Sequence, residues 1–292
     1  MKLKAYAKIN LGLDVIRRRE DGYHEVRMIM QTIRMFDQLE MEKCSRPGIR
    51  LTTNLPYVPS NENNLVYKAA KLLMDEFQIP EGVEIRLGKF IPVAAGMAGG
   101  SSDAAAALVG MNRLFGLGLS QEELMLRGVK IGADVPYCVM RGTALAEGIG
   151  EKLTRLSPMP PCYILIGKPG ISVSTKMVYT NLRLDGSTRH PDIDGMIDAL
   201  SRGSLEGITD RLENVLESVT IPRFPVIRQI KDVMMDCGAM NALMSGSGPT
   251  VFGIFNDREK AEQAYGRLKE SRLAKQVFLT TAFNYGGTED DK

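Results

Sequence analysis

The stretch that most constrains the fold of this chain is residues 91–107, which read IPVAAGMAGGSSDAAAA. Before it, residues 83–87 alternate apolar and polar side chains as a half-buried strand does, and Pro92 ends the extended run. Within and after it, residues 104–115 place apolar side chains at helical spacing. The sequence therefore predicts a loop rich in glycine and serine between a strand and a helix.

A loop of this composition can hold an anion such as phosphate. Glycines let backbone N–H groups approach an anion closely, serine hydroxyls donate further hydrogen bonds, and the following helix directs its positive dipole end at the same point. The loop has neither the Lys-Ser or Lys-Thr pair of a Walker A motif nor the G-x-G-x-x-G spacing of a dinucleotide fold. A tight turn, with a serine or Asp103 at the start of an alanine-rich helix, is the alternative.

Two further segments carry a family resemblance. AYAKINLGLDV at residues 5–15 interrupts an apolar run with Lys8 and Asn10, and IGADVPYCV at residues 131–139 places Asp134 among small residues. Together with the loop, they resemble the GHMP kinases, small-molecule kinases that include galactokinase, homoserine kinase and mevalonate kinase. Four further segments resemble one branch of this family, whose members act on a cytidine diphosphate derivative. These segments are DGYHE (21–25), NENNL (61–65), AEGIGE (146–151) and MSGSGPTVF (244–252).

The resemblance covers about residues 5–255 and implies a fold of the α+β class. In the GHMP kinase fold, a ribosomal-protein-like α/β domain precedes a ferredoxin-like α/β sandwich, with the active site in the cleft between them. The proline-rich segment SPMPP at residues 157–161 is the best linker. We therefore expect domains at residues 1–157 and 158–287, followed by a disordered polar tail at 288–292.

Phosphoryl transfer from ATP to an alcohol requires an anchored polyphosphate, a metal ion and a group that accepts or orients the hydroxyl proton. Asp134 is the candidate base, because a loop of small residues leaves room for a substrate hydroxyl. The resemblance places the family's catalytic lysine and aspartate on Lys8 and Asp134. It also implies ATP and Mg²⁺, with the metal ligands unassigned. A solvated strand-end lysine and an aspartate that caps a turn are the alternatives.

The nucleotide contacts follow from the resemblance. Asn64 and Lys89 are expected beside the adenine and phosphates of ATP, although a helix cap and an exposed charge are competing roles. The loop supplies the remaining expected contacts: Pro92, Val93, Ala94, Ala95, Gly96, Met97, Ala98, Gly99, Gly100, Ser101 and Ser102.

Three alanines depart from the family's more glycine-rich loop. Ala94, Ala95 and Ala98 stand where glycines are frequent, and alanine reaches positive φ only at a cost. We therefore expect the hold on phosphate to depend more on Gly96, Gly99 and Gly100. The late segment Ser245–Gly248 resembles the family's third motif and is expected to pack against this loop, or else to be a tight turn.

The acceptor is expected to be recognised through its cytosine. The dipeptide Asp21-Gly22 predicts a turn that presents Tyr23 and His24 at a surface, and aromatic faces stack on a pyrimidine. The resemblance implies that Tyr23 stacks on the base, that His24 meets its hydrogen-bonding edge and that Tyr179 covers the other face. Asn10 is assigned to the same substrate site. A hairpin tip with Tyr23 packed on the sheet and His24 in solvent is the alternative.

Composition fits an ordinary enzyme rather than a nucleic-acid or membrane protein. The net charge is only +2, and the chain has four widely spaced cysteines, no CxxC pair and two histidines, which makes structural zinc unexpected. There is no secretory h-region and no apolar run long enough for a bilayer. We expect a cytoplasmic protein with reduced thiols, a monomer or weak homodimer, without nucleic-acid or membrane partners.

The expected activity is an ATP-dependent kinase reaction on an alcohol group of a cytidine diphosphate derivative, in non-mevalonate isoprenoid precursor synthesis. Two alternatives stay open. One is another GHMP kinase with a sugar, homoserine or mevalonate acceptor, and the other is a nucleotide-binding regulator on the same scaffold without turnover.

Overall fold

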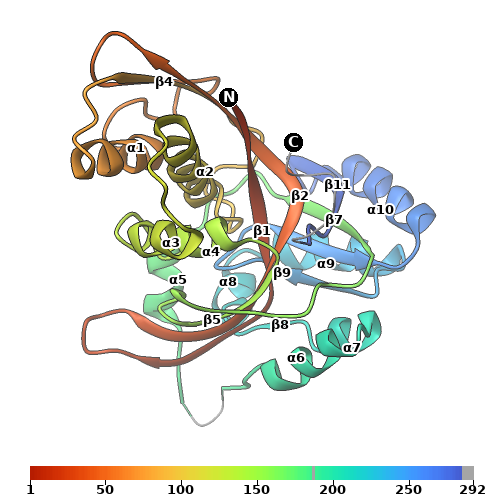
Figure 1. Ribbon diagram of the computed structural model, residues 1–292. Coiled ribbons are helices and arrows are strands. Elements are labelled where there is room, and N and C mark those ends of the chain that lie inside the picture. The colour runs from red at the N-terminus through yellow and green to blue at the C-terminus, as the bar shows by residue number, and fades with distance from the viewer. Residues whose placement is uncertain (186–187, 285–292) are drawn as a thin grey trace. The chain divides into compact units, whose positions relative to one another are not determined.

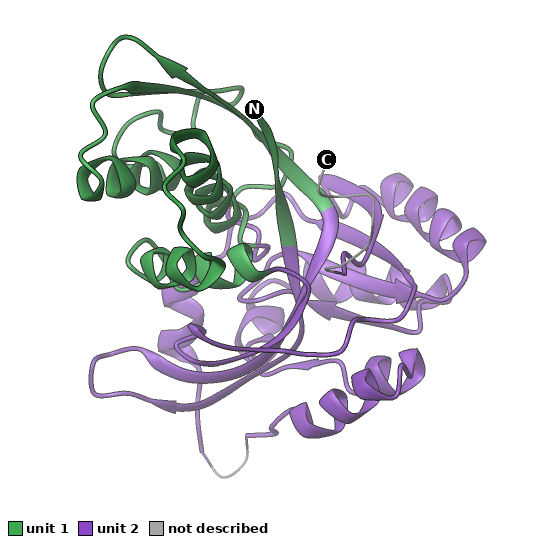
Figure 2. Ribbon diagram, in the orientation of Figure 1, with its two compact units in different colours: residues 1–7, 35–93, 98–140 green, residues 8–34, 94–97, 141–292 purple. Residues whose placement is uncertain are grey.

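The computed structural model describes residues 1–185 and 188–284, which divide into two compact units (Figures 1 and 2). Unit 1 comprises residues 1–7, 35–93 and 98–140, and unit 2 comprises 8–34, 94–97 and 141–292. The long strands β1 (Lys2–Arg18) and β2 (His24–Cys44) contribute to both units. The expected family-domain boundary after residue 157 lies inside unit 2 and stays a prediction. The expected tail at 288–292 lies outside the described residues.

The sheet of unit 1 is built around β4 (Gly82–Gly88), the strand predicted before the loop. β4 pairs antiparallel with Gln38–Cys44 of β2 and parallel with β3 (Ile49–Thr53). Its alternate residues Val83, Ile85 and Leu87 are buried, as their spacing predicts.

Helices pack tightly on this sheet and on each other. α1 (Leu65–Glu76) packs against α2 (Gly99–Phe115), and α3 (Gln121–Val129) packs against α4 (Val135–Met140). A Cβ atom at Gly110 of α2 would lie 2.3 Å from the Met41 sulfur on β2, so the glycine lets the Met41 side chain lie against the helix.

The helix cap considered for Asn64 is confirmed, whereas the predicted start of the next helix is wrong. Asn64 caps α1 by accepting a hydrogen bond from the Val66 N–H at 2.9 Å, and Ser120 and Glu123 form a capping box at the start of α3. α2, however, already begins at Gly99. Residues 99–102, predicted to be loop, therefore form the first turn of a helix.

Unit 2 contains a group of paired strands around the β1–β2 hairpin. β5 (Thr143–Gly148) pairs antiparallel with Val26–Gln31 of β2 and with β6 (Lys152–Arg155). The short β8 (Glu213–Asn214) pairs in parallel with β1 at Gly12–Leu13. Four further helices belong to this unit: α5 (Thr175–Asn181), α6 (Ile193–Ser201), α7 (Leu205–Thr209) and α8 (Glu217–Arg223).

Unit 2 also contains a four-stranded antiparallel sheet in the order β11-β7-β10-β9. Its elements are β7 (Tyr163–Lys168), α9 (Val226–Asp236), β9 (Asn241–Met244), β10 (Val251–Phe255), α10 (Arg258–Ser271) and β11 (Gln276–Thr281). A Cβ atom at Gly167 of β7 would lie within 3.2 Å of Ile230, Met234 and Leu268, so α9 and α10 cover the same face. This strand-helix-strand-strand-helix-strand order confirms the predicted ferredoxin-like sandwich. Among the described helices, none could cross a bilayer.

Candidate active site

Lys89, which follows β4, is buried in an ionic cluster. Its ammonium donates to the carboxylates of Asp37 and, at 2.7 Å, Asp103, and all three side chains are almost completely excluded from solvent. The alternative role of an exposed strand-end charge is therefore wrong. Asp37 was missed in the sequence, because a single acid in the apolar alternation of β2 looks like an exposed strand residue.

Gly99 lies directly over this ammonium. A Cβ atom there would lie 3.2 Å from Lys89 Nζ and 3.1 Å from Ile91 Cγ2. Gly99 and Gly100 are both helical and need no positive φ. Gly99 thus leaves space beside Lys89 and Ile91 and does not provide the positive φ that was predicted for it.

The first turn of α2 brings two predicted segments together within unit 1. Ser101 is half-buried, and a Cβ atom at Gly132 would lie 4.0 Å from its hydroxyl oxygen. Gly132 begins the segment that contains Asp134, which is half-buried just before α4. Within the described residues of unit 1, no hydrogen bond or ion pair engages the Asp134 carboxylate. Its carboxylate is therefore available to a ligand within this unit.

Two other predicted nucleotide contacts already have protein partners. The Ser102 hydroxyl is buried and donates to the Tyr6 carbonyl at 2.7 Å. The Asn64 amide caps α1 with its oxygen and donates from its nitrogen to the Pro59 carbonyl at 2.7 Å. Ser101 is consequently the serine with the freer hydroxyl for an anion.

Lys8 and Asn10 meet in unit 2. The Lys8 ammonium donates to the Asn10 side-chain oxygen at 2.8 Å, and both side chains are buried. The solvated strand-end role of Lys8 is therefore wrong. Within the described part of unit 2, this neutral amide is the side-chain partner that Lys8 has. A buried ammonium without a counter-charge is costly, so an anionic ligand or transition state would be favoured beside it.

The late segment Ser245–Gly248, here called the late glycine loop, packs against the predicted anion-binding loop at residues 92–102, here called the phosphate loop. This packing was predicted. The Ser245 hydroxyl donates to the Gly96 carbonyl at 3.0 Å. Gly96 has φ 74°, and a Cβ atom there would lie 2.2 Å from the Ser245 carbonyl oxygen. Ala94 and Ala98 also adopt positive φ, 52° and 53°, although this conformation is costly for alanine.

The three predicted aromatic residues belong to unit 2. Tyr23 is 61% exposed at the turn, where its N–H donates to the Asp21 carboxylate at 3.0 Å, so it is not packed on the sheet. The His24 ring faces the Tyr179 ring of α5, with centroids 5.0 Å apart and planes tilted by 47°. Burial and then Arg18 lower the pKa of His24, so the ring is neutral at pH 7 and both donates and accepts hydrogen bonds.

Two family models match the chain. That of the GHMP kinases N terminal domain matches residues 64–142, and that of the GHMP kinases C terminal matches residues 196–273. The chain is 57% identical to the 4-diphosphocytidyl-2-C-methyl-D-erythritol kinase of Lachnoclostridium phytofermentans. The matched 283 residues are 97% of this chain and 97% of that relative. The chain belongs to the 4-diphosphocytidyl-2-C-methyl-D-erythritol kinase family.

Solved structures agree with this membership. A crystal structure of a 4-(cytidine 5'-diphospho)-2C-methyl-D-erythritol kinase is 33% identical, with a TM-score of 0.83 over 97% of this chain and 99% of that chain. The homoserine kinase of Cytophaga hutchinsonii is 19% identical with a TM-score of 0.76, over 96% of this chain and 95% of that chain, and shows the shared fold alone. The chain therefore has the GHMP kinase fold, and its family is one of ATP-dependent small-molecule kinases.

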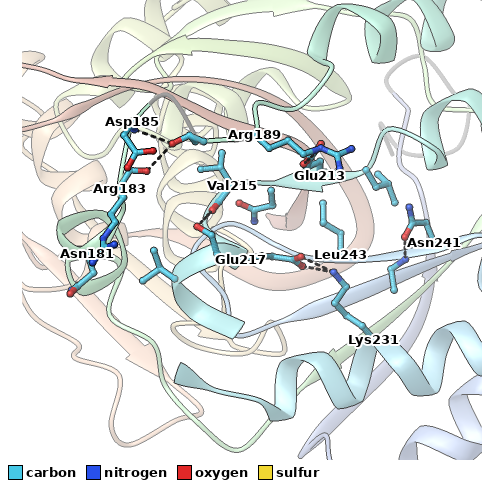
Figure 3. Close-up of a pocket in the computed structure, with 16 residues that line it drawn as sticks. Asn181, Arg183, Asp185, Arg189, Glu213, Val215, Glu217, Lys231, Asn241 and Leu243 are labelled. Carbon is cyan, nitrogen blue, oxygen red and sulfur yellow. Dashed lines mark hydrogen bonds and ion pairs between the residues drawn. The ribbon is translucent and has the colours of Figure 1, made fainter. Parts of the chain in front are cut away.

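A cavity of about 660 Å³ in unit 2 is separate from the residues that the family resemblance selects (Figure 3). Its charged lining is largely paired: Lys231 binds Glu217 at 2.7 Å, and Arg189 binds Glu213 at 3.0 Å. None of the predicted site residues lines it. Its paired charges do not identify a ligand.

The described residues do not form a metal site in advance of ligand binding. Within the described ranges, no three His, Cys, Asp or Glu side chains are grouped to hold a metal ion. Mg²⁺ usually keeps several waters and takes its remaining ligands from one or two carboxylates and substrate phosphates. The residues present thus fit a metal ion that enters with a nucleotide, not one in a protein cage.

Proposed function

We propose that this chain transfers the terminal phosphoryl group of ATP to the 2-hydroxyl of 4-diphosphocytidyl-2-C-methyl-D-erythritol. The observation that carries the proposal is the Lys8 ammonium, which is buried against the neutral Asn10 amide in the motif that the family resemblance marks as catalytic. The named function of a relative 57% identical over nearly the whole chain supports the choice of substrate.

Lys8 and Asp134 are proposed as the catalytic pair. The oxygen of the acceptor hydroxyl bonds to the γ-phosphorus, and the Asp134 carboxylate accepts the proton that this hydroxyl loses. The bond between that phosphorus and the β,γ-bridging oxygen breaks, and ADP leaves. The Lys8 ammonium stabilises the negative charge of this transfer, and Asn10 fixes its direction.

The nucleotide is proposed to bind at the start of α2. Backbone N–H groups at a helix N-terminus favour phosphate, and the Ser101 hydroxyl can add a donor. Mg²⁺ would enter with ATP and neutralise charge on its phosphates. Asn64 and Lys89 are retained as residues near the nucleotide, the first with its amide already capping α1.

The acceptor is proposed to bind through its cytosine between Tyr23 and Tyr179, with His24 reading the base edge. The contact of the His24 and Tyr179 rings supports this assignment, because it places two of the three residues in one cluster. The exposed Tyr23 ring is available for stacking.

The cellular setting follows as a proposal. We place the reaction in non-mevalonate isoprenoid precursor synthesis, in the cytoplasm, in a monomer or weak homodimer without nucleic-acid or membrane partners. Light scattering at increasing protein concentration tests the oligomeric state.

Mass spectrometry of the reaction products tests the function. Purified protein is incubated with MgATP and the cytidyl acceptor, and parallel samples contain homoserine, mevalonate or galactose. We expect one phosphoryl group to be added to the cytidyl compound. Phosphorylation of another acceptor alone would indicate a different GHMP kinase, and ATP binding without any product would indicate a regulator.

A further inference from the structure

Three consecutive backbone positions before the phosphate loop are held by side chains of unit 1. The Asn54 side chain accepts from the Lys89 N–H at 2.8 Å and donates to the Lys89 carbonyl at 3.2 Å. One oxygen of Asp37 accepts the N–H groups of Phe90 and, at 2.8 Å, Ile91. These bonds fix the chain where it leaves β4.

The same carboxylate is linked to α2 through Lys89. The second oxygen of Asp37 accepts from the Lys89 ammonium, which also donates to Asp103 in the second turn of the helix. Gly99, the first residue of α2, lies against that ammonium. Asp37, Lys89 and Asp103 thus connect the residues that lead into the phosphate loop with the start of α2.

The Lys89 ammonium is poorly suited to be a phosphate ligand itself. Its side chain is 4% exposed, and two of its three N–H donors are directed at carboxylates. Movement of the ammonium toward a phosphate would weaken these ion pairs between buried groups, which is costly. Although burial acts to lower it, the carboxylates of Asp103 and Asp37 raise the pKa of Lys89.

We propose that Asp37, Lys89 and Asp103 form a positioning cluster that sets the phosphate loop entry and the first turn of α2 for the nucleotide. Lys89 acts through this cluster and not as a direct ligand of ATP. This inference rests on the proposed function, because it takes the bound nucleotide to be ATP.

Asp103 holds the proton that balances the cluster. Two carboxylates share one ammonium, and burial, opposed by Lys89 and assisted by Asp37, raises the pKa of Asp103 to about 8. Oδ2 of Asp103 faces Lys89, whereas Oδ1 is buried without a hydrogen-bond partner among the described residues. At pH 7, below this pKa, Asp103 is mainly protonated, and an asparagine can replace this acid without a change in charge.

Hydrogen exchange of the nucleotide-free protein tests the cluster without any enzymatic reaction. Exchange in peptides that cover residues 89–103 is compared among the unmodified protein, Lys89→Met and Asp103→Asn. Lys71→Met is the matched control, because Lys71 pairs with Asp75 on the exposed face of α1. Circular dichroism confirms folding of each variant.

We expect Lys89→Met to speed exchange in this segment by roughly tenfold or more, because it leaves buried acids unpaired and loosens the segment. Asp103→Asn and the control should exchange as the unmodified protein does. Unchanged exchange in a folded Lys89→Met variant would overturn the proposal. If Lys89→Met does not fold, Asp37→Ala, which removes the acceptor of the Phe90 and Ile91 N–H groups, takes its place. Faster exchange than in the control would then support the proposal, and unchanged exchange in folded protein would overturn it.

Calorimetry with a non-hydrolysable ATP analogue adds a second readout. Ionisation of Asp103 above about pH 8 adds a negative charge near the helix start, so analogue affinity should fall by roughly threefold to tenfold. Asp103→Asn should lack this decline, and an identical decline in both proteins would contradict the inference. Intact analogue binding without turnover would contradict the proposed function and leave the cluster standing.

Discussion

The hydroxyl oxygens of Thr175 and Ser247 lie 2.8 Å apart and join α5 to the late glycine loop. One side of this link leads to Gly96 through Ser245, and the other leads along α5 to Tyr179. Within unit 2, this contact therefore links the loop segment that holds Gly96 to the helix that carries Tyr179.

Thr175→Val should disturb acceptor binding more than ATP binding. The substitution keeps the side chain's shape and removes the hydrogen bond, which leaves the part-buried Ser247 hydroxyl unpaired. We expect the acceptor KM to rise by roughly threefold to tenfold, with kcat changed less than twofold. Ser174→Ala, which removes only the N-cap of α5, is the control. Equal KM values for Thr175→Val and the unmodified protein would show that the contact does not position Tyr179.

Gly96→Ala should weaken nucleotide binding far more than Gly100→Ala. A Cβ atom at position 96 collides with the Ser245 carbonyl, whereas at position 100 it makes only an ordinary 3.6 Å contact with Leu65. The expected loss for Gly96→Ala is at least tenfold in ATP affinity, measured by calorimetry on folded protein. Equal losses in the two variants would mean that the late loop does not shape the phosphate loop.

Removal of one aromatic ring should weaken binding of the cytidyl acceptor. Stacking on a base is worth about 1–3 kcal/mol, so Tyr23→Ala and Tyr179→Ala should each lose roughly tenfold to more than a hundredfold in acceptor affinity. ATP affinity should hardly change. The uridyl analogue of the acceptor should be a poor substrate, because an acceptor replaces the exocyclic donor of cytosine. Equal use of both nucleotides by unimpaired alanine variants would refute cytosine recognition.

Asp103→Asn should remove a loss of stability at rising pH. The pKa of Asp103 is raised from 3.8 to about 8, so between these values the folded protein binds a proton that the unfolded chain has released. Stability from this group therefore falls as pH rises through that window. Urea unfolding of the variant should show a flatter pH dependence and greater stability near pH 8 than the unmodified protein. Asp75→Asn, at an exposed pair, should follow the unmodified protein.

Local chemistry made much of the fold predictable. The half-buried strand before the loop and the helix cap at Asn64 could be predicted from the sequence, because each depends on residues close in sequence. The motif resemblance added the expectation that a ribosomal-protein-like α/β domain precedes a ferredoxin-like sandwich. These features therefore required no knowledge of distant contacts.

Tertiary contacts decided the rest. Asp37 lies 52 residues from Lys89, and no local pattern marks the two as partners. The positive φ angles of Ala94 and Ala98 oppose the residue's intrinsic preference, which costs about 1–2 kcal/mol at each position and is imposed by the surrounding structure. Such features depend on long-range packing that a sequence pattern does not contain.

The kinetics of Asp134→Asn, Lys8→Ala and the double variant, with MgATP and the cytidyl acceptor, test the proposed chemistry most directly. Each single substitution should lower kcat by a factor on the order of 10² to 10⁴ with little change in ATP affinity, because each removes a group that acts in the transition state. The double variant should be scarcely slower than either single one, because the two residues act as a unit. Losses that multiply in full, or single variants that keep normal turnover, would contradict a Lys8–Asp134 catalytic pair.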